Sequence, residues 1–249
     1  MTDTSRGSFW KAFWDSYPRR AAETEYLRQV GKTVGGMEIT REQFDTIDED
    51  IEHHLELTSS DVVLDLCCGN GLITRELARK CDQVVGVDFS RPLIEQARKI
   101  TAEQNVRYIN MDVIQIARLT SLFEGRFSKV LWYEALQFFD EREFRSILAA
   151  LSDLTTGDVS ILIGSVLDHD RKWRFFDTPK RRLEYAVKIV LLRREVGLGK
   201  WWRRSEIERA CRQCGFACDF KDQSELLHTS HYRIDVKLYP LHDGRYGGR

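Results

Sequence analysis

Hydrophobic and polar positions along the chain follow two alternating patterns. Short apolar runs bounded by polar or glycine residues predict strands, and longer stretches with apolar residues three or four positions apart predict amphipathic helices. The strands are expected to begin at Val62, Gln83, Val106, Ser128, Val159, Ala217 and His231. Helical patterns at residues 72–80 and 92–104, and a helix that begins near Asp140, separate the earlier strands. This alternation is typical of a parallel α/β sheet.

The N-terminal part of the chain departs from this alternation. Amphipathic stretches occur at residues 8–17, 21–30 and 41–57. They predict an N-terminal helical cap over residues 1–57, followed by the main domain over residues 58–249. Between them, Val30-Gly31-Lys32-Thr33 is similar to part of a P-loop, but Tyr26 stands where that motif requires its earlier glycine.

The C-terminal part has two further local signals. Ser205, followed three positions later by Glu208, predicts a capping box for a helix that ends before Gly215. Residues 231–238 alternate polar and apolar side chains, which predicts a half-exposed final strand.

The turn after the first strand carries the clearest chemical signal. Here an apolar strand leads into Asp65, and Gly69 and Gly71 follow just before a helix. Glycines allow a ligand to approach the backbone, and the helix directs its free N–H groups to the same place. Asp88 ends the next strand, seventeen residues after Gly71, where a strand-helix-strand unit places an acid against a ribose.

The residues of this turn also discriminate between nucleotides. A dinucleotide fingerprint has glycine three residues after Gly71, whereas this chain has Thr74. Asp65 would repel a pyrophosphate but suits a cationic group such as a sulfonium or an ammonium. The two features argue against a dinucleotide.

At these residues the sequence resembles the class I S-adenosylmethionine-dependent methyltransferases, whose first motif is D-x-x-x-G-x-G. The motif reads Asp65-Leu66-Cys67-Cys68-Gly69-Asn70-Gly71 here. The resemblance implies an α/β, Rossmann-like, mostly parallel seven-stranded sheet with an antiparallel last strand, helices on both faces and S-adenosyl-L-methionine as the cofactor.

The resemblance also implies which residues bind this cofactor. Asp88 would bind the ribose hydroxyls, Phe89 and Ser90 would contact the adenine, and Asp112 would hold the adenine amino group. The expected cofactor-binding residues are Asp65, Cys67, Gly69, Asn70, Gly71, Asp88, Phe89, Ser90, Met111, Asp112, Val113 and Tyr133. In the family, N-terminal extensions close over the cofactor, which would bring Trp14, Tyr17 and Tyr26 near the pocket; plain packing of these aromatics is the alternative.

Two residues are candidates for acid–base chemistry. Ligands bind at the carboxyl ends of parallel strands, so Tyr133, Glu134 and Gln137 are expected where the cofactor and the substrate meet. His169 follows the fifth strand at the same edge. Glu134 and His169 are therefore the expected catalytic residues, although the sequence alone favours a surface histidine in an acidic loop for His169.

Composition restricts the class of protein. Hydrophobic residues make up 42% of the 249 residues, and the formal net charge is −1. The first residues are polar and no apolar run is long enough to cross a bilayer, so a cytoplasmic protein is expected. Cys211, Cys214 and Cys218 lack a nearby fourth ligand, which favours core packing over a metal site.

Residues 171–204 have a different charge from the rest, with twelve basic residues and three acids. The resemblance implies that an insertion after the fifth strand forms a substrate lid, so the charge of this basic insertion indicates an anionic substrate; a solvated helix face remains an alternative. The apolar stretch inside residues 180–194 also fits a helix on an anionic membrane surface.

The expected activity is methyl transfer to oxygen or nitrogen of a small polar, anionic or carrier-bound metabolite such as a sugar derivative. RNA methylation is the main alternative; the basic insertion favours it, but the near-zero net charge and the lack of a recognisable RNA-binding module argue against nucleic acid. A noncatalytic S-adenosylmethionine-binding module is a further alternative.

Overall fold

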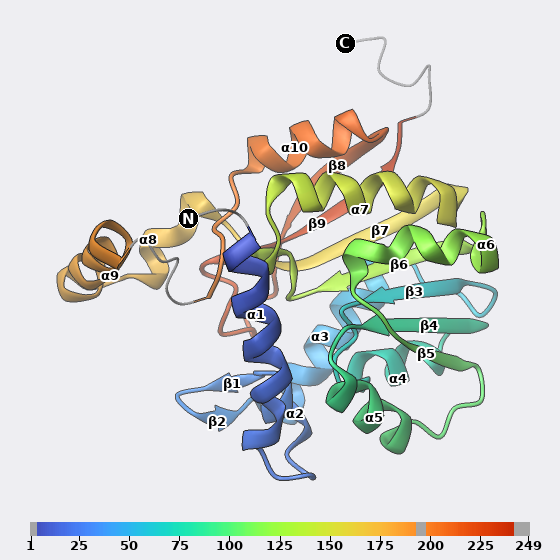
Figure 1. Cartoon of the computed structure of the whole chain (residues 1–249), viewed down its shortest axis with the longest axis horizontal. Coiled ribbons are helices and arrows are strands. Elements are labelled where there is room, and N and C mark those ends of the chain that lie inside the picture. Colours follow the sequence, from blue (N-terminus) through green and yellow to red (C-terminus); the bar gives the residue numbers. More distant parts are fainter. Residues whose placement is uncertain (1–3, 193–197, 242–249) are drawn as a thin grey trace.

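The computed structural model describes residues 4–192 and 198–241. These residues form a seven-stranded sheet of order β5-β4-β3-β6-β7-β9-β8 and the helices around it (Figure 1). The strands are β3 (Val62–Leu66), β4 (Gln83–Asp88), β5 (Val106–Asn110), β6 (Phe127–Tyr133), β7 (Thr155–Leu167), β8 (Phe216–Asp222) and β9 (Arg233–Pro240). The pairs from β5 to β7 are parallel, and β9 is antiparallel to both β7 and β8. The predicted Rossmann-like sheet with an antiparallel last strand is confirmed.

Helices cover both faces of the sheet, as predicted. One face carries α3 (Arg41–Leu55), α4 (Leu72–Ala78) and α5 (Arg91–Ile100), and the other carries the 3-10 helix η2 (Val113–Leu119), α6 (Thr120–Phe123), α7 (Glu141–Leu154) and α10 (Arg204–Gln213). Burial on both faces explains why the central strands are almost continuously apolar.

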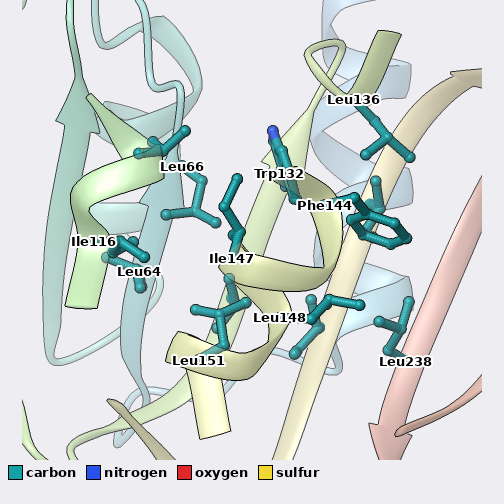
Figure 2. Packing of buried hydrophobic residues seen from close by; sticks show 14 of the residues in the cluster. Leu64, Leu66, Ile116, Trp132, Leu136, Phe144, Ile147, Leu148, Leu151 and Leu238 are labelled. Atoms are coloured by element: carbon teal, nitrogen blue, oxygen red, sulfur yellow. The ribbon is translucent and has the colours of Figure 1, made fainter. Parts of the chain in front are cut away.

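Helix α7 forms the centre of the larger core. Its first turn is closed by a capping box, in which the Asp140 carboxylate accepts from the Glu143 backbone N–H at 2.7 Å and the Glu143 carboxylate accepts from the Asp140 N–H at 2.9 Å. Figure 2 shows the apolar face of α7 against the sheet, with Ile147 and Leu151 among its fully buried side chains. A fully buried leucine replaced by alanine in such a core costs about 2–5 kcal/mol of unfolding free energy.

The prediction of a half-exposed last strand is wrong. β9 lies inside the sheet between β7 and β8, and the polar side chains of Arg233 and Asp235 are buried with the apolar ones. Asp235 accepts from the Ser165 N–H at 2.6 Å and from Gln223 at 3.0 Å, and Arg233 donates to the Ser165 carbonyl, while the Arg233 Nε has no hydrogen-bond partner within the described chain. Burial of Asp235 therefore replaces water with protein hydrogen bonds.

The start of the C-terminal helix also differs from the prediction. α10 begins at Arg204, and the Glu206 carboxylate, not that of Glu208, accepts the backbone N–H of Arg203 at 3.0 Å. The buried Trp202 holds the chain just before the helix, since its N–H donates to the Leu167 carbonyl. Tertiary packing thus sets the first turn earlier than the local motif indicates.

The N-terminal extension is less helical than predicted. It contains α1 (Thr4–Ser16), the 3-10 helix η1 (Pro18–Arg20), the short α2 (Tyr26–Gln29) and a hairpin of β1 (Thr33–Val34) and β2 (Met37–Glu38). The Glu25 carboxylate accepts from the Ala22 N–H at 2.7 Å, a local bond that competes with a continuous helix over residues 21–30. The hairpin, which turns at Gly35 and Gly36, was not predicted.

The remaining elements follow β7. The 3-10 helix η4 (His169–Arg171) leads into the basic insertion, whose described helices are α8 (Lys172–Phe175) and α9 (Pro179–Leu192), followed by the start of α10 at Arg204. Cys211 lies in the main core with Cys214 and Cys218 packed against it, so the predicted core packing of these thiols is confirmed. Among the described residues, no helix is long and apolar enough to cross a membrane.

Gly71 provides a test of this packing. Its φ is +79°, and a Cβ there would lie 2.4 Å from the Tyr108 hydroxyl oxygen and 2.9 Å from the Ala97 Cβ. Gly71→Ala should therefore lower the unfolding free energy by about 2–4 kcal/mol, from the left-handed backbone and from overpacking. Urea denaturation measures this change.

Gly125→Ala is the matched control, because Gly125 has φ +57° and a Cβ added there would have no heavy atom within 4 Å. Its cost should be about 1–2 kcal/mol, the backbone contribution alone. Equal costs at the two positions would show that Tyr108 and Ala97 can move away from Gly71.

Candidate active site

A pocket lies at the carboxyl ends of the parallel strands, where α/β sheets bind ligands. It encloses about 1040 Å³ including its open mouth. Its floor comes from the ends of β3, β4, β5 and β6, and α1 and residues 30–32 close over it. The walls combine aromatic rings with a few charged side chains: Trp10, Trp14, Tyr133, Phe138 and Phe139 with Lys11, Lys32, Asp88, Asp112, Glu134 and Glu143.

The turn after β3 has the backbone that its glycines predicted. Cys67 and Gly69 have φ values of +58° and +57°, and both line the pocket together with Asn70. A Cβ on Gly69 would lie 2.9 Å from the Val30 Cγ1, so the missing side chain leaves room for the N-terminal extension. Gly71 is packed against Tyr108 and lies outside the set of described residues that line the pocket.

Asn70 joins this turn to the extension. Its amide nitrogen donates to the Tyr26 carbonyl at 2.8 Å and to the Gln29 side-chain oxygen at 3.0 Å. Its Oδ1 is buried and has no hydrogen-bond partner within the described chain. Because buried acceptors are normally satisfied, this atom is a candidate to accept a hydrogen bond from a ligand in the pocket.

Asp65 lies behind the pocket wall, although we expected it to face a cationic ligand. It is buried, and its carboxyl accepts from the Thr74 hydroxyl at 2.7 Å. Burial raises the pKa of Asp65 to about 7. Thr74, which replaces the third glycine of a dinucleotide motif, is therefore the direct partner of this acid. A contact between Asp65 and the cofactor remains a prediction.

Asp88 lines the pocket at the end of β4 and holds two turns together. One carboxylate oxygen accepts the Gly69 N–H at 3.0 Å and the other accepts the Ser90 N–H at 2.8 Å. Burial raises the pKa of Asp88 to about 6, against the opposing effect of these two bonds. Each oxygen keeps a free acceptor site, because a carboxylate has about four in total.

The neighbours of Asp88 divide between the pocket and the interior. Phe89 lines the pocket, whereas Ser90 is buried and donates from its hydroxyl to the Trp14 carbonyl at 3.3 Å. After β5, Asp112 and Val113 line the pocket, and Asp112 forms an ion pair with Lys11 of α1.

Met111 packs against the main core and is not among the pocket-lining residues of the described chain.

Glu134 forms an ion pair that the sequence analysis missed. It follows β6 with φ +54°, and its carboxylate lies 2.6 Å from the Lys32 ammonium. Lys32 is almost fully buried and lies 4.8 Å from the centre of the Tyr133 ring. Burial alone would raise the pKa of Glu134, but Lys32 and Arg233 hold it below its usual value. Glu134 is therefore a carboxylate and a weak proton acceptor.

His169 lies apart from this group. It is on η4, its N–H donates to the Trp202 carbonyl, and its Nδ1 is 3.6 Å from the nearest Asp170 oxygen. Neither His169 nor Gln137 belongs to the pocket wall formed by the described residues. Gln137 instead donates to the Glu134 carbonyl at 2.6 Å. A catalytic role for His169 remains a prediction without a contact to support it.

Some aromatic residues of the N-terminal extension line the pocket and others do not. Trp10 and Trp14 line the pocket and meet Phe138, at ring-centre distances of 4.6 and 5.7 Å. Tyr17 and Tyr26 are not part of the wall as far as the chain is described. Within the described residues, the basic insertion contributes no side chain to this wall; Arg193, Arg194 and Glu195 of that insertion fall outside the described range.

Comparison with known proteins identifies the domain that carries these residues. Residues 63–157 match the family model described as a methyltransferase domain. Over these residues the chain carries a methyltransferase domain. The match contains the turn after β3, Asp88, Asp112 and Glu134, and it excludes α1 and Lys32.

Curated relatives are similar over short segments. An uncharacterized methyltransferase of Schizosaccharomyces pombe is 46% identical over 52 residues, which are 21% of this chain and 20% of that protein. A 23S rRNA (uracil(1939)-C(5))-methyltransferase of Legionella pneumophila is 35% identical over 80 residues, 31% of this chain and 18% of that protein. The chain thus spans about a fifth of the length of these relatives.

Solved structures resemble the chain over its whole length. Phosphoethanolamine N-methyltransferase 1 of Haemonchus contortus, in complex with phosphoethanolamine and S-adenosylhomocysteine, has a TM-score of 0.71 at 16% identity, covering 100% of this chain and 52% of that one. Magnesium protoporphyrin IX methyltransferase of Synechocystis, with bound S-adenosylhomocysteine, has a TM-score of 0.61 at 13% identity, covering 94% and 99%. At these identities the likeness concerns the fold.

The Lys32–Glu134 pair gives a testable pH dependence. In the wild type the pKa of Glu134 is held below its unfolded value. The ion pair therefore contributes its full stabilisation above the unfolded pKa, and this contribution is lost as the pH falls through the folded-state pKa. Lys32→Met removes the cation, and burial then raises the pKa of Glu134. The variant should lose most unfolding free energy, about 3–5 kcal/mol, at neutral pH and much less near pH 4. Urea denaturation between these pH values measures the difference.

Lys237→Met is the control, because Lys237 pairs with the exposed Glu56 at 2.6 Å. Its loss should stay below about 1 kcal/mol at neutral pH. A Lys32→Met variant whose stability loss does not change with pH would contradict the ion pair.

Proposed function

We propose that this protein transfers the methyl group of S-adenosyl-L-methionine to oxygen or nitrogen of a small polar, anionic or carrier-bound metabolite, such as a sugar derivative. The observation that carries the proposal is Asp88: an acid at the end of β4, in the pocket wall, with one free acceptor site on each oxygen. The match of residues 63–157 to a methyltransferase domain supports the same reaction.

The residues around Asp88 fit this cofactor. Asp88 would accept both ribose hydroxyls, Phe89 would contact the adenine, and Asp112 would accept from the adenine amino group. The turn at Cys67, Gly69 and Asn70 would hold the amino-acid part. Two buried polar atoms of the wall, the Asn70 Oδ1 and the Trp14 Nε1, have no partner in the described chain and fit ligand hydrogen bonds.

The bound cofactor supplies an electrophilic methyl group on a positively charged sulfur. The protein's task is then to align the acceptor with that methyl group and to exclude water, and such alignment is worth up to about 7–11 kcal/mol. Trp10, Trp14 and Phe138 form an apolar wall suited to this. An amine acceptor would need only its neutral form, whereas a hydroxyl would also have to lose its proton.

Glu134 orients the acceptor in this proposal. Lys32 keeps it ionised, so it can accept a hydrogen bond from an acceptor hydroxyl or amine at the end of β6. Lys32 presents the complementary donor beside it. The pair thus offers one positive and one negative group to a polar acceptor, while leaving little basicity for proton removal.

The anionic character of the acceptor is supported by the charge of the basic insertion alone. Inside the pocket, the two cations Lys11 and Lys32 each pair with a carboxylate, Asp112 and Glu134. An anionic group of the acceptor is therefore expected to extend beyond these two pairs, toward the insertion that follows β7.

RNA methylation is the second candidate. The match to an rRNA methyltransferase favours it, but that match covers 80 residues of the family domain. The net charge of −1 argues against extended phosphate contacts.

Donor binding is the first test of the proposed function. Titration calorimetry should give micromolar-range dissociation constants for S-adenosylmethionine and its demethylated product, and weaker binding of NAD. Asp88→Ala should weaken donor binding by about ten- to a hundredfold, because the ribose hydroxyls lose charge-assisted partners. Because the pKa of Asp88 is about 6, wild-type binding should also weaken as the pH falls below that value.

Asp82→Ala is the control, since Asp82 is exposed and lies outside the described pocket wall. Its donor affinity should equal that of the wild type. Tighter binding of NAD than of S-adenosylmethionine, or full donor affinity in a folded Asp88→Ala protein, would refute the assignment.

Acceptor identity is the second test. With isotope-labelled donor, phosphorylated or carboxylated amines and alcohols should be methylated faster than their uncharged analogues, with most of the difference in KM. Total RNA should remain unlabelled. Labelled RNA whose binding falls steeply with salt would replace the metabolite proposal with the RNA alternative.

A further inference from the structure

The insertion forms an arm outside the sheet. We call α8 and α9 together the basic arm; Figure 1 shows it at the edge of the molecule, apart from the helices that cover the sheet. Aromatic contacts attach its base to the rest of the protein: the centre of the Phe175 ring lies 4.8 Å from that of Tyr232 and 5.9 Å from that of Trp201. The arm is thus a folded element attached at one end.

The arm exposes apolar side chains to solvent. Leu183 is 66% exposed and Val187 is 42% exposed, and their spacing of four residues places both on one side of α9. Trp173 of α8 is 47% exposed. Such exposure offers no stabilisation to the isolated chain, because these side chains remain in water.

The same arm carries cations that lack acidic partners. Among the residues that the structure describes, Lys172, Arg174, Lys180 and Arg182 form no ion pair with a carboxylate; Arg181 alone pairs within the arm, with Asp177. Arg182 donates instead to the backbone carbonyls of Phe176 and Trp173. Glu184 is the one further acid in the described part of the arm. The arm therefore has an uncompensated positive charge.

We propose that the basic arm docks on an anionic membrane surface. Leu183 and Val187 would enter the boundary between headgroups and acyl chains, and Lys180, Arg174 and Lys172 would lie beside lipid phosphates. Exposed apolar side chains flanked by unpaired lysine and arginine are the combination that holds an amphipathic helix in that layer. Nucleic acid would use the cations but would leave Leu183 and Val187 in water.

The position of the basic arm in the fold determines which edge of the sheet would lie near the membrane. The arm follows η4 directly after the carboxyl end of β7, the sheet edge that also holds the pocket. A protein attached through the arm therefore keeps this edge near the bilayer. The docking itself does not depend on methyl transfer, and it is measured without donor or acceptor.

Vesicle binding by the full chain tests the proposal. The protein should sediment with vesicles of phosphatidylcholine containing phosphatidylglycerol, and not with pure phosphatidylcholine vesicles. The double variant Leu183→Asn/Val187→Asn keeps the charge and should bind the anionic vesicles roughly tenfold more weakly or worse. Arg174→Gln/Lys180→Gln keeps the apolar stripe and should lose roughly fivefold for each removed charge. High salt should weaken wild-type binding.

Matched controls use exposed residues elsewhere. Leu122 of α6 is 58% exposed and Arg91 of α5 is highly exposed, so Leu122→Asn and Arg91→Gln should bind vesicles as the wild type does. Because the substituted residues are exposed, every variant should fold as the wild type does. Thermal unfolding curves verify this.

Three results would overturn the proposal. The first is equal binding, or no binding, to anionic and neutral vesicles. The second is a concentration-dependent dimer in ultracentrifugation that Leu183→Asn/Val187→Asn dissociates, which would make the stripe a contact between two copies. The third is RNA binding that both double variants abolish while vesicle binding is absent.

Discussion

The carboxylate of Asp88 joins the two turns that form the floor of the pocket. Its oxygens accept one N–H from the turn after β3 and one from the turn after β4. A buried charge needs such partners, and here the partners are the backbone atoms whose positions define the site. The same residue therefore fixes the shape of the floor and supplies its main hydrogen-bond acceptor.

The N-terminal extension is tied to the floor at four successive strand ends. The contacts are Asn70 to the Tyr26 carbonyl after β3, Ser90 to the Trp14 carbonyl after β4, Asp112 to Lys11 after β5, and Glu134 to Lys32 after β6. Each contact joins an extension residue to a polar residue that follows a strand, and three of these polar residues, Asn70, Asp112 and Glu134, line the pocket. The extension is thus part of the site, and Trp10 and Trp14 complete its apolar wall.

The family match covers one part of the pocket wall. Residues 63–157 contain Asp88, Phe89 and Asp112, the proposed contacts of the donor, and also Glu134, the proposed contact of the acceptor. Trp10, Trp14 and Lys32, which close the other side of the pocket, precede that match. The proposed donor contacts therefore lie in the matched part, whereas the Lys32–Glu134 pair joins the matched part to the N-terminal extension.

The sequence by itself determined the sheet, the turn after β3 and the acids at the strand ends. These features are local: apolar runs of strand length, glycines that adopt positive φ, and a fixed spacing between Gly71 and Asp88. Cys67, Gly69, Asn70, Asp88, Phe89, Asp112, Val113, Tyr133 and Glu134, all named from the sequence, line one pocket.

Only the tertiary structure decided the partners of the buried charges. Lys32 and Glu134 are 102 positions apart, and no periodicity links them. Asp65 faces Thr74 and not the pocket, the buried Asp235 accepts from Ser165 and Gln223, and the buried Arg233 donates to the Ser165 carbonyl. A side chain's polarity predicts its need for a partner, whereas burial and long-range packing determine which partner it finds.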